Sequence, residues 1–267
     1  MNTKKITLLS TLLALLLFAC GPQQKESKET PEEKTPEAPA ITLTDDVPAS
    51  PAYADAQLSL SGAVGLAKGD SNYTASFNFD VANYELGVQT EGAATRGIAN
   101  SGKGQHIHFI VNNGPYSAHY GPTFDKPMDE GNYVLLAFLS RSYHESVKNA
   151  SAFWIDKVKV GEPAEELEVD FTAPHMFYSR PKGTYSGADT EKVMLDFYLL
   201  NTTLSPDGNK VRATINGQEF LIDEWKPMYI NNAPKGELSV KLELIDATGN
   251  VIPGPFNSVE RKVTLAE

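Results

Sequence analysis

The sequence has few cysteines and few basic residues. Cys20 is the only cysteine among 267 residues, so neither an intramolecular disulfide nor a multi-cysteine zinc site can form. Lys and Arg number 23 against 34 Asp and Glu, which gives a net charge of −11. Phosphate recognition needs a basic face, so we expect no nucleic-acid partner.

Catalytic motifs are also lacking. The chain contains no Gly-x-Ser-x-Gly, no His-Glu-x-x-His and no phosphate-binding P-loop. A zinc-activated water with Glu145 as general base stays open as a catalytic alternative. We nevertheless expect a binding protein rather than an enzyme, and we assign no catalytic residues.

The N-terminal segment has the features of an export signal. Two lysines precede an apolar run over residues 6–18, which is too short to span a bilayer as a helix and is typical of a signal peptide. The run ends in Leu-Phe-Ala-Cys at residues 17–20, which resembles the lipobox of bacterial lipoproteins. That resemblance implies a signal peptide over 1–19 and acylation of Cys20, which would anchor the protein in a membrane. Gly21 resembles the residue that follows the cysteine in outer-membrane lipoproteins. This resemblance implies that the protein is anchored in the outer membrane and faces either the periplasm or the cell surface.

The segment after the predicted lipidation site has little to bury. It is rich in Pro, Glu and Lys. Such a composition favours a solvated tether, so we expect a flexible linker over residues 20–54.

The rest of the chain contains an internal repeat. Three period-two patterns recur in the same order, residues 77–86 at 195–204, 107–112 at 211–216 and 131–139 at 236–244. Regular alternation over short runs, with turn signals between them, is typical of an immunoglobulin-like β-sandwich. The sequence therefore predicts an all-β protein with two tandem immunoglobulin-like sandwiches, over residues 55–163 and 164–267.

The repeat also predicts individual strands. In the first copy we expect them near 57–62, 73–82, 106–112, 116–121, 132–140 and 152–160. In the second copy we expect them near 192–200, 210–216, 237–245 and 258–265.

Histidines are concentrated in the first copy. His106 and His108 alternate with core positions of one strand, so both point to its other face, where the second copy carries Lys210 and Arg212. A four-residue hairpin loop after that strand would place His119 opposite His108. His144 follows a neighbouring strand of the same sheet. The four residues predicted as a metal site, suited to Zn²⁺ or Cu²⁺, are His106, His108, His119 and His144.

A second set of residues supports a different ligand. The loop at 140–148 carries hydroxyl, guanidinium and ammonium groups that suit a phosphate or a carboxylate. The candidate anion-binding residues are Ser140, Arg141, Ser142 and Lys148.

Three segments carry a resemblance to a known group. Residues 105–116, 138–148 and 178–187 are similar to signatures of uncharacterised lipoproteins of Bacteroidota with tandem immunoglobulin-like domains, some of which are named phosphopeptide-binding. The sequence thus indicates an envelope-anchored ligand-recognition protein and leaves three interpretations open: a metal site, an anionic-ligand site, and a structural or adhesive protein with hydrogen-bonded surface histidines. Its expected partners are the membrane, through the lipid, and an envelope protein or a small ligand.

Overall fold

The computed structural model describes residues 40–46 and 48–267, which are almost entirely β-strand and loop. The predicted signal peptide, Cys20 and the first part of the predicted linker lie outside the described residues. Within the described ranges, no helix is long and apolar enough to cross a membrane. Two short 3-10 helices, η1 (Ala93–Thr95) and η2 (Gly187–Thr190), lie in loops.

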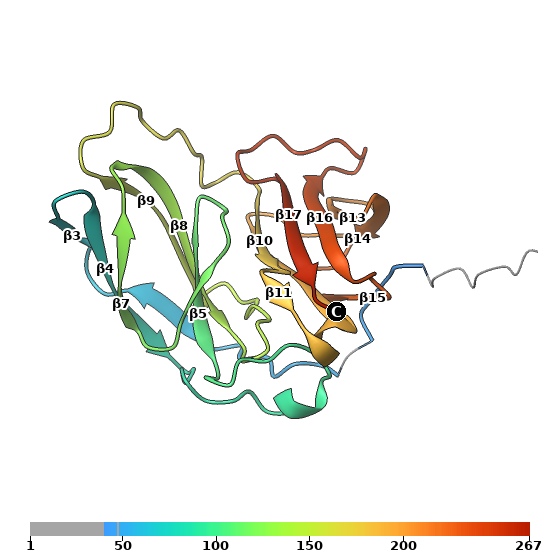
Figure 1. The fold of residues 1–267 in the computed structure, drawn as a ribbon. Helices are drawn as coiled ribbons and strands as arrows, with labels where there is room; N and C mark the ends of the chain where they lie inside the picture. Colours follow the sequence, from blue (N-terminus) through green and yellow to red (C-terminus); the bar gives the residue numbers. More distant parts are fainter. Residues whose placement is uncertain (1–39, 47) are drawn as a thin grey trace, which may run out of the picture. The chain divides into compact units, whose positions relative to one another are not determined.

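The first half of the described chain forms a two-sheet sandwich, sandwich 1 (Figure 1). One sheet consists of β2 (Gln57–Leu60), β3 (Gly65–Lys68), β4 (Tyr73–Ala82) and β7 (Thr123–Met128). The other has the order β6-β5-β8-β9, with β5 (His106–Val111), β6 (Ser117–His119), β8 (Gly131–Ser140) and β9 (Phe153–Val160). Alternate side chains of β4, β5 and β8 form the core between the two sheets.

The second half forms sandwich 2. One sheet has the order β1-β15-β12-β10, with β1 (Thr42–Thr44), β10 (His175–Arg180), β12 (Lys192–Leu200) and β15 (Met228–Asn231). The other has the order β11-β17-β16-β13-β14, with β11 (Thr184–Tyr185), β13 (Lys210–Ile215), β14 (Gln218–Ile222), β16 (Gly236–Ile245) and β17 (Ser258–Leu265).

The two sandwiches repeat the same strand order. Strands β6-β5-β8-β9 of sandwich 1 correspond in order to β14-β13-β16-β17 of sandwich 2, and the central pairs β5 and β13, β8 and β16 also share the matched sequence patterns. Both sheets are antiparallel throughout these four strands. The fold prediction is therefore confirmed: the protein is all-β and its sandwiches are immunoglobulin-like. Strands β1, β3, β7, β10, β11, β14 and β15 were not among those predicted.

One face of β8 contacts sandwich 2 instead of solvent. Val134, Leu136 and Phe138 point away from the core of sandwich 1 and pack against Phe177 of β10 and Tyr198 of β12. Phe138 and Tyr198 stack with ring centroids 4.7 Å apart. Strands β8, β10 and β12 are buried on both faces over most of their length, so their sequences are largely apolar.

A tight turn between β5 and β6 fixes the contact between the sandwiches. Asn112 and Asn113 both have positive φ, and the Gly114 N–H donates to the Val111 carbonyl oxygen at 2.8 Å, which closes a β-turn over the two asparagines. The Asn113 side chain donates hydrogen bonds to the carbonyl oxygens of Met176 and Phe256 and accepts one from the Tyr178 N–H. This turn therefore holds the end of β5 against β10.

The predicted linker ends earlier than residue 54. Residues 42–44 form β1, which pairs with β15, because Leu43 packs into the core of sandwich 2. Arg96 donates hydrogen bonds to the carbonyl oxygens of Pro48 and Ala49, at 2.7 and 2.9 Å. The second part of the predicted linker is thus bound to both sandwiches.

A buried cluster of three histidines

His106 and His108 lie on the face of β5 that points toward sandwich 2. Ile107 and Phe109 of the same strand point into the core of sandwich 1, so alternation places both histidines on the opposite face, as predicted. Both imidazoles are fully buried, since the neighbouring sandwich covers this face. Their Nε2 atoms are 3.0 Å apart.

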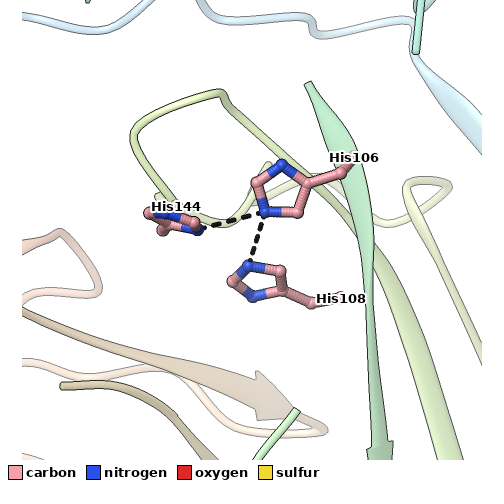
Figure 2. Close-up of side chains that lie close together, drawn as sticks. All are labelled: His106, His108 and His144. Carbon is pink, nitrogen blue, oxygen red and sulfur yellow. Dashed lines mark hydrogen bonds between the residues drawn. The ribbon is translucent and has the colours of Figure 1, made fainter. Parts of the chain in front are cut away.

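His144 joins them from the loop between β8 and β9. Its Nδ1 atom is 3.1 Å from Nε2 of His106 (Figure 2). The His144 backbone has φ 71°, a left-handed conformation that a non-glycine residue rarely adopts and that costs on the order of 1 kcal/mol or more. Strain of this kind is concentrated at functional sites, and here it directs the imidazole toward β5.

The three rings offer one nitrogen each to a common point. These three atoms all lie within 4.8 Å of one another. His106 donates its Nδ1–H to the carbonyl oxygen of Gly104, at 2.8 Å, so its Nε2 carries a lone pair and no proton. That lone pair faces both other histidines, yet it accepts only one strong hydrogen bond. A metal ion among the three nitrogens would use all three lone pairs.

The groups behind the rings are suited to orienting metal ligands. A ligating imidazole needs an acceptor for its second N–H, and His106 has the Gly104 carbonyl. Ser179 of β10 lies with Oγ 3.2 Å from Nδ1 of His108, so it is placed to serve that ring in the same way. Gly104 is itself constrained: φ is +86°, and a Cβ there would lie 2.4 Å from the carbonyl oxygen of Val88.

Burial keeps the cluster neutral. Desolvation lowers the pKa of His106 to about 4 and holds the pKa values of His108 and His144 well below the ordinary value. The cations Arg180 and Lys182 lower the pKa of His108 and His144 further. Neutral imidazole is the form that binds a metal, so the cluster needs no proton loss at neutral pH.

Tyr116 completes the surroundings of the cluster. Its ring stacks on His108 with centroids 3.5 Å apart and planes at 13°. Its hydroxyl oxygen is 3.3 Å from Nδ1 of His144. The Lys182 ammonium lies 4.4 Å from the centre of the Tyr116 ring. Desolvation raises the pKa of Tyr116 to about 12.

The placement predicted for His119 is wrong. The connection between β5 and β6 is one residue shorter than the four-residue loop assumed from the sequence, so β6 pairs with β5 one residue out of the expected register. His119 lies opposite Ile107, not His108, and therefore points to the other face of the sheet. There it stacks on Phe124 with ring centroids 3.4 Å apart and hydrogen-bonds Ser117.

The four predicted anion-binding residues are engaged by the chain itself. Arg141 is buried, pairs with Glu145 at 3.1 Å and donates to the carbonyl oxygens of Pro51 and Ser146. Lys148 pairs with the buried carboxylate of Asp196 at 2.6 Å.

The two serines of that set are bound as well. Ser142 accepts a hydrogen bond from the Thr90 N–H, and Ser140 donates to the carbonyl oxygen of Arg141. Buried charges are normally paired in this way, so the four groups stabilise the fold and do not form an open anion site.

Sequence reasoning missed Tyr116, Ser179, Arg180 and Lys182. The last three belong to the motif at residues 178–187, which the sequence analysis singled out without a role. They reach the cluster only because β10 packs on β5, a contact that periodicity within one strand does not reveal.

Comparisons with known proteins assign the chain to no family. No family model matches the chain, and no curated protein matches it significantly. Among solved structures it is similar to the fibronectin(III)-like modules of CbhA from Clostridium thermocellum, with 12% identity, a TM-score of 0.27, and coverage of 79% of this chain and 94% of that one.

Two further structures show the same range of similarity. The two tandem V-type regions of a v-region-containing chitin binding protein match with 7% identity, a TM-score of 0.23, and coverage of 79% and 99%. The protein SGBP-B of the mixed-linkage glucan utilization locus of Bacteroides ovatus, solved with a heptasaccharide, matches with 12% identity, a TM-score of 0.22, and coverage of 78% and 47%.

Proposed function

We propose that this protein is an envelope-anchored ligand-recognition lipoprotein that binds a transition metal, Zn²⁺ or Cu²⁺, through His106, His108 and His144. The observation that carries the proposal is the convergence of three neutral imidazoles, two fully buried and one half-buried, whose nitrogens lie within 4.8 Å of one another. Hydrogen-bonded surface histidines would be exposed and would titrate near pH 6.5, whereas His106 and His108 are fully buried.

The chemistry of the donors favours these metals over others. Imidazole suits Zn²⁺ and Cu²⁺, whereas Mg²⁺ and Ca²⁺ require oxygen ligands. Within the part of the chain that the structure describes, no carboxylate joins the three histidines in the cluster.

The test is calorimetric titration of the protein with Zn²⁺ and Cu²⁺ at pH 7.5. We expect one ion per chain, and a ligand at a hundredfold excess over Kd stabilises the fold by about 2.7 kcal/mol. For a unit of this size that corresponds to a rise in Tm of roughly 5–10 °C. His108→Ala should abolish both effects.

His119→Ala is the matched control, because His119 lies on the same sheet but on its other face. It should leave binding intact. The metal proposal is wrong if neither ion binds more tightly than about 10 μM, a loose limit for scattered surface histidines. The cluster would then serve only as a set of hydrogen-bonded side chains at the contact between the sandwiches.

The lipid anchor is the second part of the proposal. It rests on the lipobox resemblance at residues 17–20 and on the single cysteine. A tether of up to about 20 residues between Cys20 and β1 would hold the metal-binding unit at a distance from the membrane.

A further inference from the structure

The side chain of Tyr116 lies against two of the three histidines of the cluster, His108 and His144. Its ring is held in place by stacking on His108 and by the amine of Lys182, which also donates a hydrogen bond to the Tyr116 carbonyl oxygen at 2.7 Å. The residue is 5% exposed, and its hydroxyl points at the cluster, 3.3 Å from Nδ1 of His144.

Three donor–donor distances in the cluster are close to the edge of a metal tetrahedron, and the three histidine nitrogens all lie within 4.8 Å of one another. Zn²⁺ ligands at ~2.0–2.1 Å from the ion in tetrahedral geometry are separated from each other by roughly 3.3–3.4 Å. The contacts in the cluster are 3.0 Å for His106–His108, 3.1 Å for His106–His144 and 3.3 Å for Tyr116–His144. The hydroxyl oxygen therefore stands at the distance from a donor nitrogen that a fourth ligand would have.

Charge gives an independent reason for an anionic fourth ligand. Three neutral imidazoles leave the full double charge of the ion in a buried site, and burying unpaired charge is costly. Arg180 and Lys182 add positive charge around the same site, with their cationic groups 5.8 and 4.4 Å from the centre of the Tyr116 ring. A phenolate among these cations would reduce the net charge.

We propose that Tyr116 is the fourth ligand, bound through its phenolate oxygen, in the metal site of the proposed function on which this inference rests. When the metal binds, the phenol O–H bond breaks, the proton passes to solvent and an oxygen–metal bond forms. The site is then closed by four protein ligands, as in structural zinc sites, and not left open for a substrate.

The experiment uses Cu²⁺ as the probe, because a copper–phenolate bond absorbs visible light by charge transfer and copper–imidazole bonds do not. The full chain is titrated with Cu²⁺, and visible absorption is recorded together with binding by calorimetry. We expect a charge-transfer band that grows to one equivalent. Tyr116→Phe keeps the ring stacked on His108 but removes the oxygen, so the band should disappear while copper still binds.

The affinity should fall in Tyr116→Phe by at least about tenfold, the lower end of what losing even an outer-sphere partner costs a metal site. Tyr120→Phe is the control. Its ring centroid is 5.0 Å from that of His106, but its hydroxyl is hydrogen-bonded to Ser101 at 2.7 Å. Tyr120→Phe should keep both the band and the affinity.

The outcomes separate this inference from the proposed function. If wild-type protein binds Cu²⁺ without a charge-transfer band, or if the band survives in Tyr116→Phe, the fourth ligand is water or another group and the inference is overturned while the metal site stands. If Cu²⁺ does not bind at all, the proposed function fails and the inference with it. The wild-type spectrum decides even where a variant does not fold.

Discussion

At the scale of single residues, His106 organises the cluster. Its hydrogen bond to Gly104 leaves the lone pair on Nε2, and both other rings approach that atom. The neighbouring glycine is needed because the chain approaches Val88 too closely for a side chain. One backbone carbonyl thus determines which nitrogen of the central histidine is free to bind a metal.

The depressed histidine pKa values predict acid sensitivity of the metal-free protein. In the folded state the pKa of His106 is about 4, below its ordinary value of about 6.5 in the unfolded chain. Below pH 6.5 the unfolded state therefore binds more protons, and stability falls as pH falls. Each such histidine should lower the free energy of unfolding by about 1.4 kcal/mol for each pH unit below 6.5, down to its pKa in the folded state.

Denaturant unfolding between pH 7 and pH 5, with a chelator present, measures this effect. The free energy of unfolding should decrease over the range, and His106→Gln should reduce the slope by up to one proton per molecule. A stability that does not change between pH 7 and pH 5 would show that the buried rings do not stay neutral.

At the scale of elements, the sequence predicted strands more accurately than it predicted their pairing. Four strands of sandwich 2 were predicted to within about one residue at each end, because their apolar alternation is regular. The register of β6 was off by one residue, because it depends on the backbone conformation of Asn112 and Asn113, which composition does not reveal. That single residue moved His119 from the cluster to the opposite face.

Strands that are buried on both faces explain another part of the difference between the predicted and the observed strands. The run of apolar residues in β8 signalled a covered face, and the structure covers it with β10 and β12. Strand β10 itself was not predicted, since a strand with six buried residues has no alternation to detect. Ser179 and Arg180 on this strand consequently escaped the sequence analysis.

At the scale of the whole molecule, the site belongs to both sandwiches. The three histidines come from sandwich 1, whereas Ser179 and Lys182 reach the cluster from sandwich 2. Sandwich 2 has no counterpart of the cluster, since Arg212 at the position matching His108 forms an ion pair with Glu243 at 2.9 Å. The duplicated fold has therefore diverged, with one copy carrying the histidines and the other covering them.

The substitution Cys20→Ser tests the predicted membrane anchoring. Removing the acylated thiol should release the protein from the membrane fraction into the soluble fraction, because two or more acyl chains are needed for durable anchoring and none could then be attached. Fractionation of cells followed by a high-salt wash measures the distribution. Sedimentation of the variant with membranes after that wash would contradict the lipoprotein proposal, and an unchanged melting curve would show that the body still folds.

The most direct test of the central claim is a crystal structure of the protein soaked with Zn²⁺, with diffraction recorded on both sides of the zinc absorption edge. The account predicts one anomalous peak among Nε2 of His106, Nε2 of His108 and Nδ1 of His144, at ~2.0–2.1 Å from each atom. Peaks only on exposed residues, with the three imidazoles still in direct contact with one another, would contradict it.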